Sequence, residues 1–314
     1  MKRPSWRAGC CLTLLLVCVF FQHYGLIDGD VALIMLQLDR HIGATVTALQ
    51  TDPTIAEHPF GRPIDAPLPW EEDHVFQAEL NRLGARNRIA AFATTLPNPL
   101  PGEDYNFARA ADLLRGAVIA DGEVFSMNGS IGPYSRERGF REGPIYYGTK
   151  ILRGVGGGVC KMATTLYNTA VLADFPIVSR KNHGMLVPYA NPGQDATVSY
   201  GKVDLQFEND SGHPLLIWAD TVGVTLYVAF YGQKAAPKVS WHHEILYLQE
   251  RPLIRRHNPQ LPPGSEQVLI EGSEGIGVRS WVTVEYPDGQ TKSRNLGADW
   301  YRPMPRVVEF GPRA

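Results

Sequence analysis

A run of three glycines followed directly by a long apolar-periodic segment constrains the fold of this chain most. Apolar residues recur at spacings of three and four over 159–175, which predicts a helix that Pro176 ends. The consecutive glycines at 156–158 would let a substrate backbone come close. Short segments of strand type follow at 177–180, 183–189, 196–200, 203–208, 215–219 and 222–231. One central helix before a series of strands is typical of an α+β domain.

The rest of the chain divides into recognisable segments. We expect a proline-rich linker at 28–69, an α+β domain at 70–232 and a small, separate all-β module at 245–314. The α+β domain is expected to contain two further helices, over 70–92 and 106–120. In the all-β module, the turn Pro287-Asp288-Gly289-Gln290 between 282–286 and 291–294 predicts a hairpin.

Composition excludes two broad classes of protein. Of the 314 residues, 44% are hydrophobic, which is enough for a buried core and excludes general disorder. Lys and Arg number 30 and Asp and Glu number 32, for a net charge of −2. This balance gives no electrostatic basis for binding nucleic acid, so no nucleic-acid partner is expected.

The N-terminus has the pattern of a targeting segment. Lys2, Arg3 and Arg7 precede an uncharged run at 10–21. This run suits a signal-peptide core, and extended to residue 27 it suits an uncleaved signal anchor, which we favour. A cleaved signal peptide and a buried core helix are the alternatives. With a signal peptide or an anchor, the rest of the chain is exported to the cell envelope, and an anchor would hold it on the cytoplasmic membrane.

Export would separate the cysteines into two groups. Cys10, Cys11 and Cys18 lie in the targeting segment, so the exported part keeps only Cys160. That part can form no internal disulfide. A lone thiol in an oxidising compartment is a liability unless it is buried or used.

The position of Cys160 in the sequence suits a reactive thiol. The start of a helix stabilises a thiolate, and amides near Gly156, Gly157 and Gly158 can form an oxyanion hole.

We therefore take Cys160 as a candidate nucleophile, with His183 as its base. Asp195 is the candidate that orients the imidazole, with Asp204 as runner-up. Cysteine at a helix start, with His and Asp on successive antiparallel strands, is the arrangement of papain-like and transglutaminase-like folds, by analogy only. The alternative is that Cys160 is a small buried apolar residue and His183 satisfies a turn.

No cofactor and no metal site are expected. The glycine run is followed by no Gly-Lys-Ser/Thr, and Val159 stands where a dinucleotide fingerprint needs its last glycine. His242 and His243 are adjacent on an expected strand, so their side chains lie on opposite faces.

Several motifs along the chain together resemble the VanW-like domain over residues 85–232. They are Phe125-Ser126-Met127-Asn128, Gly132-Pro133, Gly139-Phe140, Gly156-Gly157-Gly158-Val159-Cys160, Thr164-Thr165-Leu166-Tyr167-Asn168, His183, Asp195-Ala196-Thr197-Val198 and Asp204-Leu205-x-Phe207-x-Asn209. The resemblance implies a bacterial cell-envelope protein, from a family named after an accessory gene of vancomycin-resistance clusters. It implies no particular reaction.

Within these motifs, the resemblance makes four residues candidates for a substrate loop: Ser126, Asn128, Thr164 and Thr165. The chain also departs from the family pattern, with Lys161 for Gln, Ala163 for Ser and Gly184 for Ser. We expect Lys161 to be exposed on the helix; the alternative is that it helps to hold a thiolate.

The C-terminal residues are similar to a G5 module, a β-module of surface proteins. The resemblance rests on Gly272-Ser273-Glu274-Gly275, Asp288-Gly289, Gly311 and the run Asp299-Trp300-Tyr301-Arg302-Pro303-Met304-Pro305. It implies an association with envelope polysaccharide or peptidoglycan.

Three functions remain open. The first is a cysteine-dependent amidase, peptidase or transpeptidase that acts on peptidoglycan or related envelope peptides through a thioester. The second is a non-catalytic module that binds peptidoglycan or a glycopeptide, in envelope homeostasis or vancomycin resistance. The third is a scaffold at the membrane.

Overall fold

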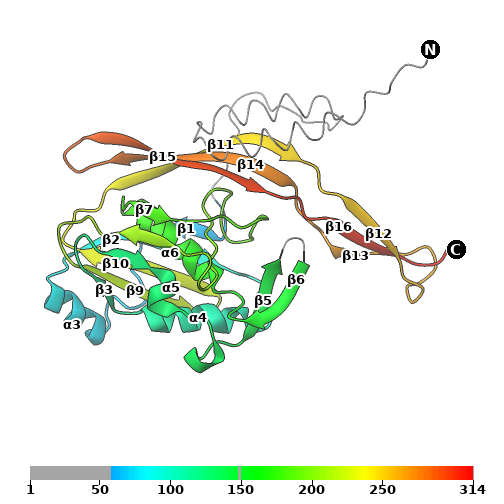
Figure 1. The fold of residues 1–314 in the computed structure, drawn as a ribbon, viewed down its shortest axis with the longest axis horizontal. Coiled ribbons are helices and arrows are strands. Elements are labelled where there is room, and N and C mark those ends of the chain that lie inside the picture. Colours follow the sequence, from blue (N-terminus) through cyan, green and yellow to red (C-terminus); the bar gives the residue numbers. More distant parts are fainter. Residues whose placement is uncertain (1–57, 148–149, 314) are drawn as a thin grey trace, which may run out of the picture. The chain divides into compact units, whose positions relative to one another are not determined.

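A five-stranded antiparallel sheet forms the centre of the protein. The computed structural model describes residues 58–147 and 150–313. The strand order in this sheet is β1-β2-β10-β9-β3 (Figure 1). Its strands are β1 (Gly61–Pro63), β2 (Asn87–Thr95), β3 (Ala117–Ile119), β9 (Leu215–Val222) and β10 (Thr225–Gly232). Together with the helices, this sheet confirms the expected α+β class.

Side chains of the central sheet alternate between two buried clusters, as the two-residue period of a strand requires. Ile217 of β9 packs with the cluster that contains Leu166. Its neighbour Trp218 lies on the opposite face, where its ring contacts Phe76 at a centroid distance of 5.1 Å. Both faces of the sheet are therefore covered.

Helix α6 (Cys160–Leu172) is the helix predicted over 159–175. It packs on β2 and β10, beside α4 (Glu103–Leu114). Every residue of α6 after Cys160 is buried, so the helix is enclosed on all sides. Elsewhere in the described part of the chain, the helices are α3 (His74–Leu83), α5 (Met127–Ile131) and the short 3-10 helix η1 (Arg136–Arg138).

The two other predicted helices are shorter than expected, and each is followed by a strand. The expected helix over 70–92 ends at Leu83, because Gly84 takes the left-handed conformation (φ 63°), and β2 follows. The expected helix over 106–120 ends at Leu114, and Gly116 (φ 82°) turns the chain into β3. Apolar spacing alone did not separate helix from strand in these segments, because both elements bury a face.

The segment that carries His183 and Asp195 is irregular, which corrects the expected strands at 183–189 and 196–200. It joins β7 (Ile177–Ser179) to β8 (Gln206–Glu208), and both strands belong to a small sheet with β4 (Val124–Ser126). We call residues 180–205 the His–Asp loop. Its amides bond to side chains and to the loop itself, as in the bond from Thr197 N to Lys181 O, and not to a neighbouring strand.

Two three-stranded sheets form the C-terminal part, called here the C-terminal sheets (residues 238–310). One contains β11 (Lys238–Gln249), β14 (Gly275–Glu285) and β15 (Thr291–Tyr301); the other contains β12 (Leu253–His257), β13 (Glu266–Ile270) and β16 (Arg306–Phe310). The predicted hairpin is confirmed, with Glu285 opposite Thr291. The C-terminal sheets begin before residue 245. They are not separate, since Val282 and Val284 join the same buried cluster as α6.

The N-terminal predictions concern residues that the structure mostly does not describe. The targeting segment and most of the linker at 28–69 lie outside the described residues. The described end of that linker contains β1, which pairs with β2 and so belongs to the central sheet. Within residues 58–147 and 150–313, no helix has the length and apolarity needed to cross a membrane.

Candidate functional site

Cys160 is the first residue of α6, and Val159 alone separates it from the glycine run. Gly156 and Gly158 have φ values of 82° and 101°, in the left-handed region that favours glycine. Cys160 is the one cysteine among the described residues, and it is half-buried and free. The residue is therefore sheltered but not fully enclosed.

Gly157 is held by contacts that leave no room for a side chain. A Cβ atom there would lie 2.3 Å from the carbonyl carbon of Gly143 in β5 (Glu142–Tyr147), which pairs with β6 (Lys150–Val155). The side-chain amide of Asn106 in α4 donates to Gly157 O at 2.7 Å and to Arg141 O at 2.9 Å. The glycine run is thus fixed between α4 and the β5–β6 hairpin.

Two backbone amides beside the thiol have no protein partner. Gly156, Gly157 and Val159 donate to backbone carbonyls, whereas within the described part of the chain no acceptor is found for the amides of Gly158 and Cys160. Free amides at the start of a helix are suited to bind an anionic oxygen.

His183 and Asp195 form a tight pair. The Asp195 Oδ2 atom lies 2.6 Å from His183 Nδ1 and accepts the His183 backbone N–H at 2.7 Å. The two side chains are 8% and 1% exposed. Because one oxygen meets both the ring and the backbone of His183, the imidazole is fixed in rotation and its Nε2 is left for another partner.

Cys160 and His183 shift each other's pKa. Burial alone would raise the pKa of the Cys160 thiol, but a hydrogen bond with His183, and the charge on that ring, lower it instead. Burial alone would lower the pKa of His183, but hydrogen bonds with Asp195 and Cys160 raise it. The pKa of Asp195 is lowered despite its burial, chiefly by His183. All three directions favour a thiolate, an imidazolium and a carboxylate.

Backbone and hydroxyl groups of the His–Asp loop surround the sulfur. Cys160 Sγ lies 3.3 Å from Thr197 Oγ1 and accepts the Val198 amide at 3.5 Å. Both contacts lower the pKa of the thiol by stabilising the thiolate. The loop therefore carries His183, Asp195 and the groups that contact the sulfur.

Arg180 and Tyr301 hold the other side of Asp195. Arg180 donates to Asp195 O at 2.7 Å and to Asp195 Oδ1 at 3.2 Å. It also pairs with Asp299 at 2.5 Å. The hydroxyl of Tyr301 donates to Asp195 Oδ1. Asp299 and Tyr301 both belong to β15.

Asp204, the runner-up to Asp195, lies in a different network. Its carboxylate accepts the Ser126 hydroxyl at 2.6 Å and the Asn128 amide at 2.9 Å, so it caps the short helix α5. Ser126 in turn accepts the amide of Gly129, and Asn128 bonds to Val203 O and Tyr134. Ser126 and Asn128 thus hold the turn into α5 and contact neither Cys160 nor His183.

Thr164 and Thr165 lie inside the core and line no substrate loop. Both are 0% exposed. Thr164 Oγ1 donates to Ala196 O and accepts the Ala196 amide, which ties α6 to the His–Asp loop. Thr165 bonds to Lys161 O and to the hydroxyl of Thr94. The sequence motif that contains them is therefore a packing motif of α6.

Lys161 is buried, which corrects the expectation of an exposed lysine. It is 1% exposed, its Nζ donates to Val224 O at 2.7 Å, and it lies 3.8 Å from the ring centroid of Phe107. Burial lowers the pKa of Lys161 to about 7, against an opposing effect of Glu103. Cys160 is absent from these interactions, so the structure gives no support to thiolate stabilisation by Lys161.

Sequence reasoning missed Arg180, Thr197 and Tyr301. Thr197 stood in a motif of the family resemblance, two residues after Asp195, and Tyr301 stood in the G5-like run, but neither was given a role at this site. Arg180 stood in no motif. No local pattern links Arg180 and Tyr301 to Asp195, which is 15 and 106 residues away from them in sequence.

The adjacent histidines of β11 form hydrogen bonds with hydroxyl side chains of β14. His242 Nε2 lies 3.0 Å from Thr283 Oγ1, and His243 Nδ1 lies 3.0 Å from Ser280 Oγ. Over the described ranges, no cluster of three or more His, Cys, Asp or Glu side chains is placed to hold a metal ion.

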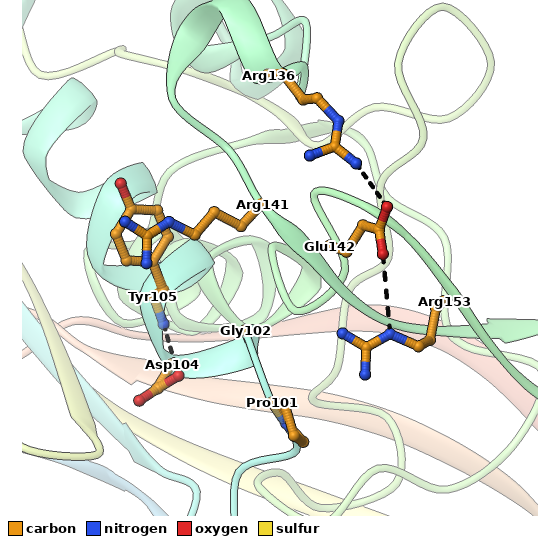
Figure 2. A pocket seen from close by; sticks show the side chains of 8 residues that line it. All are labelled: Pro101, Gly102, Asp104, Tyr105, Arg136, Arg141, Glu142 and Arg153. Atoms are coloured by element: carbon orange, nitrogen blue, oxygen red, sulfur yellow. Dashed lines mark hydrogen bonds and ion pairs between the residues drawn. The ribbon is translucent and has the colours of Figure 1, made fainter.

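A charged pocket of about 710 Å³ lies between the start of α4 and the β5–β6 hairpin (Figure 2). Arg136 and Arg153 lie on either side of Glu142, at 2.5 and 4.0 Å from its carboxylate. Arg141 lies over the ring of Tyr105, 3.6 Å from its centroid. The remaining lining residues are Pro101, Gly102 and Asp104. Three arginines against two carboxylates leave the pocket with a positive balance.

Two solved G5 domains are among the structures to which the chain is similar. The match to the G5 domain of HP0197 covers 24% of this chain and 96% of that structure, with 22% identity and a TM-score of 0.14. The IgA1 protease G5 domain covers 26% of this chain and 100% of its own, with 21% identity and a TM-score of 0.17.

The sequence comparisons agree on the α+β part. Residues 102–231 match the family described as VanW like protein. YoaR of Bacillus subtilis (strain 168) is 33% identical over 144 residues, 46% of this chain and 48% of that protein. The vancomycin B-type resistance protein VanW of Enterococcus faecalis (strain ATCC 700802 / V583) is 28% identical over 120 residues, 36% of this chain and 43% of that protein. The chain thus spans about half the length of these curated relatives. Residues 102–231 of this chain are thus similar to the VanW-like family.

Proposed function

We propose that this chain is an exported cell-envelope protein in which Cys160, His183 and Asp195 catalyse acyl transfer on peptidoglycan or related envelope peptides. One observation carries the proposal: His183 Nδ1 lies 2.6 Å from Asp195 Oδ2, and the His183 ring in turn lowers the pKa of the Cys160 thiol against the effect of burial. The envelope context is supported by the VanW-like domain and by the targeting pattern of the N-terminal residues.

In the first step, the Cys160 thiolate attacks the carbonyl carbon of an amide. The new S–C bond forms as the carbonyl electron pair moves to oxygen, and the free amides of Gly158 and Cys160 stabilise that oxyanion. The oxyanion then returns its electron pair and the C–N bond breaks. The His183 imidazolium gives its proton to the leaving amine, so the products are an amine, a thioester and a neutral imidazole.

In the second step, the neutral His183 removes a proton from water or from a second amine, which attacks the thioester. Water gives a carboxylic acid and makes the protein an amidase or peptidase, whereas an amine makes it a transpeptidase. The S–C bond breaks, and the thiolate and imidazolium are restored. Asp195 keeps its charge throughout and orients the ring.

The arrangement supports the analogy with papain-like and transglutaminase-like folds. A helix begins at the nucleophile, packs on an antiparallel sheet, and receives its base from the chain that follows. The analogy concerns the geometry of the site alone, because His183 and Asp195 lie on a loop here.

The arginine pocket favours a second candidate, a module that binds peptidoglycan or a glycopeptide without catalysis. Envelope peptides carry carboxylates, and Arg141 is an exposed guanidinium with no carboxylate partner among the described residues. A planar guanidinium binds a carboxylate through two parallel bonds. The same pocket would also serve an enzyme as a place to hold the anionic part of its substrate.

The test is to incubate the full chain with purified sacculi and peptidoglycan fragments and to analyse the products by mass spectrometry. We expect cleaved or transferred peptides with the wild type and none with Cys160→Ala. A chain with Cys10→Ser, Cys11→Ser and Cys18→Ser serves as the matched control and should stay active. Retention on sacculi by both the wild type and Cys160→Ala, with no product from either, would replace catalysis by the binding role.

A further inference from the structure

We propose that Tyr301, on strand β15 of the C-terminal sheets, is a positioning residue for the Asp195–His183 pair, so that the site is completed by this second part of the chain. This inference rests on the proposed role of Cys160 and extends it. Tyr301 contacts neither Cys160 nor His183 and acts through Asp195.

The hydroxyl of Tyr301 occupies a buried junction with two bonds. It donates to Asp195 Oδ1 and accepts the amide of Gly193 at 2.8 Å. Tyr301 is 1% exposed and Asp195 is 1% exposed, so no water competes for these bonds. One phenol therefore fixes both the carboxylate and the turn that carries it.

The two carboxylate oxygens of Asp195 bind different partners. Oδ2 holds the ring and the backbone amide of His183, whereas Oδ1 is held by Tyr301 and, at 3.2 Å, by Arg180. Arg180 also forms an ion pair with Asp299 on β15, at 2.5 Å. The orientation of the carboxylate thus depends on Tyr301 and on Arg180. The C-terminal sheets supply Tyr301 itself and also Asp299, the partner of Arg180.

Backbone bonds dock the His183 end of the His–Asp loop on the same strand. The side-chain amide of Asn182 donates to Trp300 O at 3.1 Å, and the amide of Arg302 donates to Gly184 O at 2.9 Å. His183 lies between these two contacts in sequence. Both members of the pair are therefore placed by β15, although the loop itself forms no strand.

Loss of the phenol would leave Asp195 with an unbalanced set of donors. In Tyr301→Phe, Asp195 Oδ1 keeps only Arg180, and the carboxylate turns toward that guanidinium. Oδ2 then moves off His183 Nδ1, the imidazolium loses part of its hydrogen bond, and less of Cys160 is present as thiolate at acid pH.

The experiment measures the rate of Cys160 alkylation by iodoacetamide from pH 4 to 10 in the full chain, read at the Cys160 peptide by mass spectrometry. For Tyr301→Phe we expect a rate at pH 6 at least threefold below the wild type and an equal rate at pH 9.5. Tyr286→Phe is the matched control. It also removes a phenol of the C-terminal sheets that binds a carboxylate, Asp174 at 2.5 Å, but leaves Asp195 untouched.

The outcomes separate this inference from the proposed function. A lower rate at pH 6 for Tyr301→Phe but not for Tyr286→Phe supports the positioning role. If the wild type is reactive at pH 6 and Tyr301→Phe matches or exceeds it, the positioning role is wrong and the nucleophile stands. If both variants lose reactivity equally, the loss comes from weaker packing of the C-terminal sheets on the rest of the chain. The specific role of Tyr301 is then wrong. A wild-type profile like that of an ordinary thiol overturns both proposals.

Discussion

His183 Nδ1 lies 2.6 Å from Asp195 Oδ2, and the same oxygen accepts the backbone amide of His183. Twelve residues separate the two in sequence, and no strand pairing joins them. The pair is buried, so the carboxylate is compensated by hydrogen bonds and by Arg180 and not by water. A buried ion pair of this kind favours the imidazolium form of the ring.

The first prediction concerns the charge state of Cys160. Because the pKa of the thiol is lowered and that of His183 is raised, the ion pair persists between the two values and is lost as pH falls through the Cys160 pKa. Asp195→Asn removes the charge that holds the imidazolium, so the thiol pKa should rise. At pH values below the thiol pKa the alkylation rate should then fall, by about tenfold if the pKa rises by about 1. Asp204→Asn is the control and should leave the profile unchanged. Equal profiles for wild type and Asp195→Asn would contradict the assignment.

Lys161 gives a prediction about stability against pH. Its pKa is about 7 in the folded chain and near its ordinary value of 10.5 when unfolded. The unfolded chain therefore binds more protons between these values, and folded stability rises with pH across this window. Urea unfolding at pH 7 and pH 9 should show a gain of about 1–3 kcal/mol for the wild type relative to Lys161→Met. The same pH dependence in both chains would show that Lys161 does not titrate in this range.

A pair of glycines tests the packing of the site. Gly157→Ala would place a Cβ 2.3 Å from the backbone of Gly143, so we expect a loss of roughly 1–3 kcal/mol or more in the free energy of unfolding. Gly184→Ala, beside His183, meets nothing within 4 Å and should be neutral within about 0.5 kcal/mol. Thermal and urea unfolding measure both. Equal stabilities of the two variants would refute the close approach at Gly157.

The arginine pocket predicts a loss of binding. Arg141→Ala removes the guanidinium that lies over Tyr105, so retention of the full chain on purified sacculi should fall about tenfold, equivalent to about 1.4 kcal/mol. Arg86→Ala, an exposed arginine outside the pocket, is the control for a simple change in charge. Cosedimentation at low and moderate salt measures both variants. An equal effect of the two substitutions would mean that the chain binds by general charge and not through the pocket.

The sequence was sufficient for features that are local. The spacing after the glycine run predicted α6, and the turn at 287–290 predicted the β14–β15 hairpin. Helices over 70–92 and 106–120 were overextended, because a buried strand and a buried helix face share the same apolar content. The burial of Lys161 was missed, since no local pattern shows that α6 is enclosed on all sides.

The sequence by itself determined that one thiol would stand at the start of the central helix, and it named His183 and Asp195 as its candidate partners. Tertiary structure decided which acid pairs with the histidine, because Asp195 and Asp204 differ in the folded contacts that they make and not in local pattern. It also decided that β15, more than 100 residues away, holds Asp195 through Tyr301. The reason is that burial excludes water from a carboxylate, so its donors must come from whichever segments the fold brings beside it.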